Sequence, residues 1–177
     1  MKLLLLIFLV QAVLQTIYLP ASQGAVQPMD VGLIEQTCKH TPLYNLCVSI
    51  LESDSRSSKA DVTGLALILV DVLKAKATGT RNYIKTLLRG NLKGDVRRGL
   101  SSCADLYDNV LEVLIPEANE ALQKGNPKFA EQAANDAGAE AGSCESSFSS
   151  GHSPLTESNK FMQDVSSVAA AIVRLLL

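Results

Sequence analysis

Four stretches of the chain repeat apolar side chains every three or four residues, which is the period of a helix with one buried face. They cover roughly residues 61–88, 94–122, 126–148 and 153–176. The loops between them are short, so consecutive helices are expected to lie antiparallel. The pattern predicts an all-α protein built as an antiparallel four-helix bundle.

Proline and glycine mark the breaks in this pattern. Pro116 lies inside the second stretch, where its missing N–H and its ring predict a kink or a break. Gly125 is placed to end that helix, and Asn126-Pro127 can cap and open the third. By its spacing, Phe129 belongs to the inward face of the third helix, together with a stripe of alanines.

Two shorter segments, residues 30–38 and 43–51, precede the bundle and are followed by a serine-rich break. Each is too short to be stable alone, so we expect them to form a helical hairpin. No repeat or linker indicates a second domain. We therefore predict one domain, residues 25–177, with the hairpin in residues 25–57 and the bundle in residues 58–177.

The first 24 residues have the features of a signal peptide. Lys2 precedes an unbroken apolar run at residues 3–10, and small residues at 21–25 offer a cleavage site. A membrane anchor is the alternative, but a spanning helix needs about 20 apolar residues in succession. Gln11 and Gln15 interrupt the run and Pro20 closes it. We expect export through the secretory pathway and no membrane segment after cleavage.

Composition narrows the function classes. Residues 1–24 hold one lysine and no acidic residue, so the remaining chain has 15 basic and 18 acidic residues and a net charge of −3. That charge argues against nucleic acid as a partner. The chain has no Gly-rich phosphate loop and no Gly-x-Ser-x-Gly, and the carboxylate pairs Glu117/Glu120 and Glu131/Asp136 are expected to be solvated. We predict neither an enzyme nor a cofactor.

The four cysteines, Cys38, Cys47, Cys103 and Cys144, are expected to form disulfides. Zinc or redox chemistry is the alternative, but there is no Cys-x-x-Cys, and neither histidine has metal-ligand spacing to two cysteines. Four cysteines allow three connectivities. Only Cys38–Cys47 with Cys103–Cys144 closes the hairpin and also joins two neighbouring antiparallel helices, so we predict this pairing and no metal site.

These features together resemble the plant invertase and pectin methylesterase inhibitor family over nearly all of the mature chain. The resemblance is carried by the signal, the hairpin with Tyr44 just before its second cysteine, and the four-helix body with the second cysteine pair. Residues 62–68 (VTGLALI), 73–77 (LKAKA) and 171–174 (AIVR) resemble the branch that inhibits the β-fructosidases of the cell wall or vacuole.

In that branch, a Pro-Lys-Phe tripeptide at the start of the third bundle helix enters the invertase active site. The matching residues are Pro127, Lys128 and Phe129. Without the resemblance, they indicate only a helix start with a solvated lysine and an inward phenylalanine. The resemblance implies a 1:1, reversible and pH-dependent complex with an acid invertase in the cell wall or vacuole. The Cys103–Cys144 bond is expected to clamp the helices on either side of this corner.

Two other functions are compatible with the sequence. A pectin methylesterase inhibitor would keep the fold, bind through helix faces of the bundle, and have no use for the tripeptide. A secreted carrier would open a cavity for lipids or other small ligands among the Ala- and Leu-rich helices, although two disulfides are few for such carriers. Inhibition assays with an invertase and a pectin methylesterase would separate these alternatives.

Overall fold

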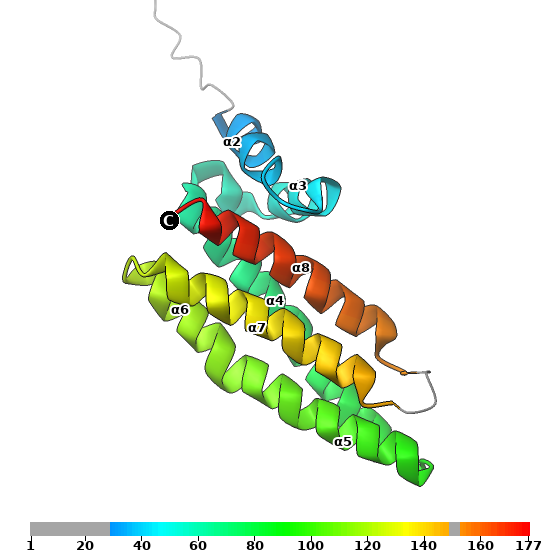
Figure 1. Cartoon of the computed structure of the whole chain (residues 1–177). Coiled ribbons are helices and arrows are strands. Elements are labelled where there is room, and N and C mark those ends of the chain that lie inside the picture. The colour runs from blue at the N-terminus through cyan, green and yellow to red at the C-terminus, as the bar shows by residue number, and fades with distance from the viewer. Residues whose placement is uncertain (1–28, 149–152) are drawn as a thin grey trace, which may run out of the picture.

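A computed structural model describes residues 29–148 and 153–177, and the predicted signal peptide and His152 lie outside these residues. The chain is helical throughout the described elements (Figure 1). They are α2 (Met29–Cys38), α3 (Tyr44–Ser53), the 3-10 helix η1 (Ser55–Lys59), α4 (Val62–Leu88), α5 (Gly94–Asn109), the π-helical η2 (Val110–Leu114), α6 (Ile115–Gln123), α7 (Pro127–Ser146) and α8 (Thr156–Arg174).

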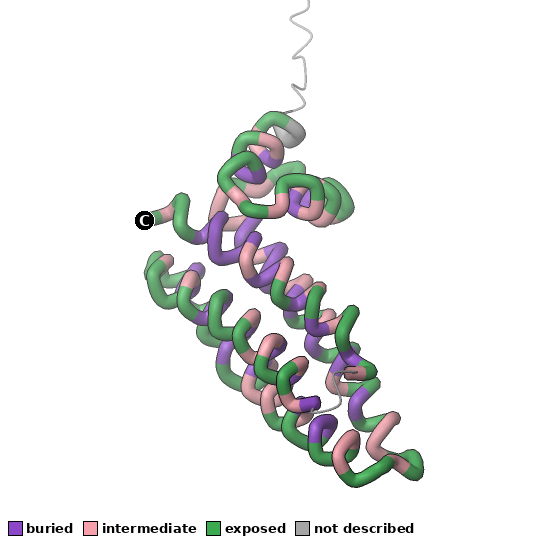
Figure 2. Tube along the Cα trace, turned by 45° about the vertical axis from the view of Figure 1, so that its right-hand side comes forward, coloured by how far each residue is buried: buried purple, intermediate pink, exposed green. Residues whose placement is uncertain are grey.

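Four rods form the body of the molecule, and this confirms the predicted bundle. They are α4, the continuous α5–η2–α6, α7 and α8, with α7 packed between α6 and α8 (Figure 1). The α6–α7 corner, the end of α8 and the hairpin α2–α3 lie at one end of the bundle. The buried faces of the rods meet along its length (Figure 2). Among the described residues, no helix is both long and apolar enough to cross a membrane.

The helix starts agree with the predicted stretches to within three residues. Asp61 caps α4, because its Oδ1 accepts a hydrogen bond from the Gly64 backbone N–H at 2.7 Å. The last helix begins at Thr156, three residues after the start of the predicted stretch at residue 153. The Ser153 Oγ accepts a hydrogen bond from the Leu155 N–H at 3.0 Å, which closes a turn before the helix. Pro154 therefore lies in that turn.

The sequence predicts a kink or a break at Pro116, and the structure has a widened helical turn just before it. Pro116 is the second residue of α6, and the π-helical residues Val110–Leu114 come directly before this helix. A proline in a regular helix lacks one hydrogen bond and collides with the carbonyl four residues earlier. The π turn changes the hydrogen-bond register at this point, so α5 and α6 continue as one rod.

Both predicted disulfides are present. Cys38 and Cys47 join α2 to α3, with their Cα atoms 5.6 Å apart. Cys103 and Cys144 join α5 to α7, with their Cα atoms 4.7 Å apart. All four cysteines are fully buried, so each bond lies within the core of its substructure.

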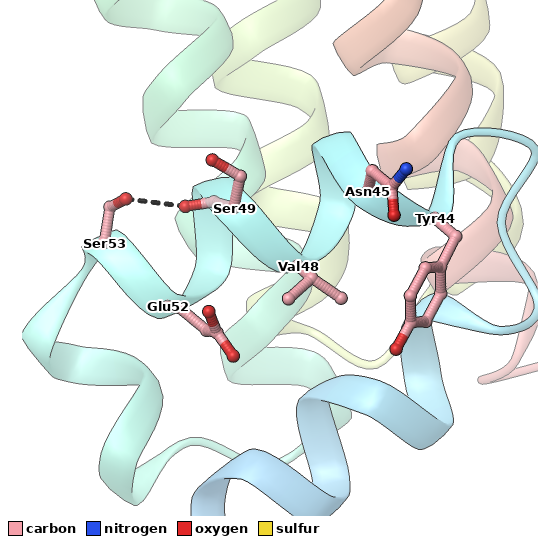
Figure 3. A pocket seen from close by; sticks show the side chains of 6 residues that line it. All are labelled: Tyr44, Asn45, Val48, Ser49, Glu52 and Ser53. Atoms are coloured by element: carbon pink, nitrogen blue, oxygen red, sulfur yellow. Dashed lines mark hydrogen bonds between the residues drawn. The ribbon is translucent and has the colours of Figure 1, made fainter.

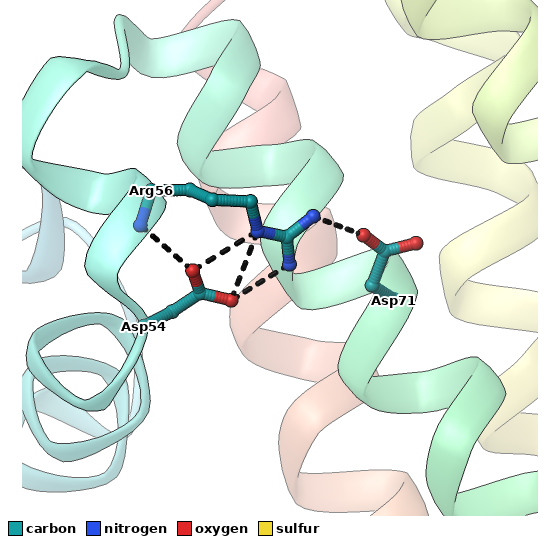
Figure 4. Close-up of polar contacts among 3 residues, drawn as sticks. All are labelled: Asp54, Arg56 and Asp71. Carbon is teal, nitrogen blue, oxygen red and sulfur yellow. Dashed lines mark hydrogen bonds and ion pairs between the residues drawn. The ribbon is translucent and has the colours of Figure 1, made fainter.

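The segment after the hairpin is held to the bundle by Arg56 (Figure 4). Its Nε donates to Asp54 Oδ1 at 3.0 Å, and its Nη1 donates to Asp71 Oδ2 of α4 at 2.6 Å. The hydrogen bonds from Arg56 lower the pKa of Asp54 to about 2. A lowered carboxyl pKa contributes stability above its unfolded value of about 4 and loses it as the pH falls toward the folded value. This attachment is therefore retained at mildly acidic pH.

Candidate functional site

The corner between α6 and α7 has a backbone fixed by glycine and proline. Gly125 has a φ of +70°, and two hydrogen bonds close the end of α6: Asn126 N–H to the Ala121 carbonyl at 2.8 Å, and Gly125 N–H to the Leu122 carbonyl at 3.3 Å. This pair is the Schellman motif. Pro127 follows as the first residue of α7, with its φ set by its ring.

Asn126 supports this corner differently from the prediction. It occupies the cap position of α7, but its side chain makes no capping hydrogen bond. Its backbone carbonyl instead accepts from the Phe129 N–H at 3.1 Å. The direction of the corner is therefore set by backbone hydrogen bonds and by the conformations of Gly125 and Pro127.

We expect Gly125→Val to destabilise the protein, because a left-handed backbone costs an L-residue about 1–2 kcal/mol. A Cβ at this position would meet no atom within 4 Å, so strain and not collision would be the cause. The melting temperature should fall by about 2–8 °C. Gly125→Asn is the control, since asparagine tolerates this conformation and should change the melting temperature little. Equal melting temperatures for both variants would contradict this role of the glycine.

The three residues of the tripeptide project from this corner. Pro127 is half-buried, Lys128 is exposed, and Phe129 is 58% exposed. The prediction that Phe129 packs inward is therefore wrong. Its neighbour Ala130 takes the buried position, while Phe129 lies at the edge of the alanine stripe, in the first turn of α7. The corner thus presents a cation and an aromatic ring side by side.

A hollow of about 220 Å³ lies beside Phe129, between α6 and the corner. It is lined by Glu117, Glu120, Ala121, Lys124, Asn126 and Phe129. Lys124 forms an ion pair with Glu120, and its hydrogen bond holds the pKa of Glu120 below the usual value. Glu117 has no ion-pair partner among the described residues. Both glutamates are exposed, as predicted, but spacing along α6 does not reveal the hollow that they line.

The end of α8 is joined to the start of α7 close to the corner. The Arg174 Nε donates to Glu131 Oε1 at 2.7 Å. The Glu131 side chain is only 18% exposed, so the prediction that it is merely solvated is wrong. The pairing depends on α8 returning to this end of the bundle, which the spacing of acidic residues in α7 does not indicate.

The Cys103–Cys144 disulfide lies away from the corner, contrary to expectation. Cys144 is near the last turn of α7, 17 residues after Pro127. At 1.5 Å per residue, about 25 Å of helix separates them. The bond stabilises the opposite half of the bundle, and the corner is held by its own backbone and by the Glu131–Arg174 pair.

A group of hydrogen-bonded side chains inside the bundle has a structural role. A buried chain of hydrogen bonds runs from the Tyr107 hydroxyl to Asn159 Oδ1 at 2.8 Å, and from Asn159 Nδ2 to Glu145 Oε2 at 2.7 Å. Burial raises the pKa of Tyr107 to about 12, so the phenol stays neutral. The polar atoms of this hydrogen-bond chain are paired with one another, which is what a buried network requires for stability.

A second hollow, of about 360 Å³, lies along α3 (Figure 3). It is lined by Tyr44, Asn45, Val48, Ser49, Glu52 and Ser53. Glu52 is the one acidic residue among these six and none of them is basic, and the Ser53 hydroxyl is already bonded to the Ser49 carbonyl at 2.6 Å. In the described part of the chain, no three His, Cys, Asp or Glu side chains gather as a metal site would need.

The sequence profile described as "Plant invertase/pectin methylesterase inhibitor" matches residues 32–172. The chain belongs to this family. The crystal structure of a mutant form of a pectin methylesterase inhibitor from Arabidopsis superposes on it with a TM-score of 0.72 at 20% identity, over 81% of this chain and 97% of that one, which shows a common fold. The members are inhibitor proteins, and the chain is an inhibitor and not an enzyme.

Within the family, the sequence is more similar to one kind of relative. It is 48% identical over 141 residues to "Cell wall / vacuolar inhibitor of fructosidase 1" of Arabidopsis thaliana, covering 80% of this chain and 67% of the relative. It is 30% identical to "Pectinesterase inhibitor" of Actinidia deliciosa, covering 73% of this chain and 69% of the relative. The higher identity supports assignment to the invertase-inhibitor branch.

Proposed function

We propose that this protein inhibits an acid invertase by inserting the corner Pro127-Lys128-Phe129 into the enzyme's active site. The observation that supports this most directly is the exposure of Lys128 and Phe129 on a rigid corner, in a chain 48% identical to an inhibitor of fructosidase. The complex is reversible and 1:1, and no covalent step is needed.

The chemistry of the corner suits such a target. An acid invertase that acts as a retaining glycosidase would hold two carboxyl groups about 5 Å apart around the scissile bond. The Lys128 ammonium group would complement their negative charge, and the Phe129 ring would add apolar contact at the rim. Because the backbone of the corner is already fixed, little conformational entropy is lost when it docks.

The complex should form in the compartments where acid invertases work, the cell wall or the vacuole. The name of the 48% identical relative points to the same places. Affinity should change with pH across the acidic range, because the carboxyl groups of the enzyme pocket that face Lys128 titrate there. Equal affinities at about pH 4.5, 5.5 and 7 would contradict this pH dependence.

Titration of an acid invertase and, in parallel, a pectin methylesterase with the purified protein tests the proposal. We expect stoichiometric inhibition of the invertase and none of the methylesterase. Inhibition of the methylesterase alone would favour the alternative function, which the 30% identity to a pectinesterase inhibitor supports. Inhibition of neither enzyme would contradict both and leave the carrier of small ligands as the alternative.

A further inference from the structure

The hollow beside Phe129 has the form of a binding site for one long side chain. Its apolar parts are Ala121 and the Phe129 ring, and its polar parts are two glutamates, a lysine and an asparagine. Because Phe129 lines the hollow and is also more than half exposed, a partner that contacts the ring comes close to the hollow.

The charges around the hollow favour a cationic guest. Lys124 and Glu120 already neutralise one another, whereas Glu117 is exposed and has no ion-pair partner in residues 29–148 and 153–177. The uncompensated charge is therefore a carboxylate. An aromatic face next to it adds attraction for a cation and covers an aliphatic stem.

We propose that the hollow receives an arginine or lysine side chain from the rim of the target enzyme, with its charged group on Glu117 and its stem along Phe129 and Ala121. This inference rests on the proposed function. It gives the corner two opposite charges: Lys128 faces the carboxyl groups of the enzyme pocket, and Glu117 faces a basic residue outside it. Such a pair fixes the orientation of the inhibitor and helps to select the enzyme it binds.

Charge variants of Glu117 test the proposal. We expect Glu117→Gln to raise the inhibition constant about fivefold and Glu117→Lys to raise it more than tenfold, because a like charge would then face the enzyme's cation. The salt dependence of the inhibition constant should also become weaker in Glu117→Gln, since one screened attraction is lost. Inhibition constants are measured at low and high ionic strength, and the melting temperature is measured for each variant.

Glu157 provides the matched control. Like Glu117, it is an exposed glutamate on a helix, so the same substitutions change the net charge of the protein equally. It lies in the first turn of α8, and this helix begins at the opposite end of the bundle from the corner (Figure 1). Glu157→Gln and Glu157→Lys should leave the inhibition constant within about twofold of the wild type.

The results separate this inference from the proposed function. If the Glu117 and Glu157 variants inhibit alike while Lys128→Ala is impaired, the hollow takes no cation and only this inference is overturned. If the wild type does not inhibit invertase, or if Lys128→Ala and Phe129→Ala both inhibit as well as the wild type, the proposed function and this inference both fail.

Discussion

Lys128→Ala and Phe129→Ala are each expected to raise the inhibition constant for an acid invertase about 10- to 100-fold. Both side chains project from a corner whose backbone is fixed at Gly125 and Pro127, so they would enter the enzyme with little loss of freedom. The lysine would lose its pairing with carboxylates, and the phenylalanine would lose the apolar area that excludes water around that pairing. Steady-state inhibition assays with the purified variants measure both effects.

The chain offers a matched control for these two substitutions. Tyr83 and Lys85 are an exposed aromatic residue and an exposed cation near the end of α4, and this end lies away from the corner (Figure 1). Tyr83→Ala and Lys85→Ala remove comparable side chains and should leave inhibition unchanged. All four variants should keep the helical circular-dichroism signal, because exposed substitutions change stability by only about 0.5 kcal/mol. Wild-type inhibition by both Lys128→Ala and Phe129→Ala would contradict the proposed mechanism.

The helices could be predicted from the sequence because local rules determine them. The apolar stripe from Leu65 to Ile84 repeats at the helical period, and Asp61 is a capping residue placed just before it. Gly125 and Pro127 have conformational preferences that hold in almost any surroundings. The disulfide pairing followed because the predicted topology placed each cysteine next to one partner.

The details of the corner depend on neighbours that are distant in sequence, so spacing could not supply them. Phe129 falls at the edge of an apolar stripe, and whether an edge position is buried depends on how closely α6 passes it. Glu131 finds Arg174 only because α8 returns to the same end of the bundle. The role of the tripeptide in binding the target enzyme is implied only by the resemblance to the family, since its residues alone indicate only the start of a helix.

Replacing both Cys103 and Cys144 by alanine is expected to lower the free energy of unfolding by about 3.9 kcal/mol. This value follows from the chain entropy of the loop that the bond closes, whose ends are 41 residues apart. The same change at Cys38 and Cys47, which are nine residues apart, should cost about 2.7 kcal/mol, because a shorter loop restricts the unfolded chain less. Urea unfolding curves of the two double variants measure the difference.

The loss of Cys103–Cys144 should lower the stability of the protein but leave its inhibition of invertase nearly unchanged. About 25 Å of helix lies between Cys144 and Pro127, so a folded variant keeps the Schellman turn, the proline and the Glu131–Arg174 pair that hold the corner. At a temperature well below its melting point, the variant should therefore inhibit invertase with an inhibition constant close to that of the wild type. A tenfold weaker inhibition by fully folded protein would show that the bond controls the corner from a distance, through the packing of α7 against its neighbours.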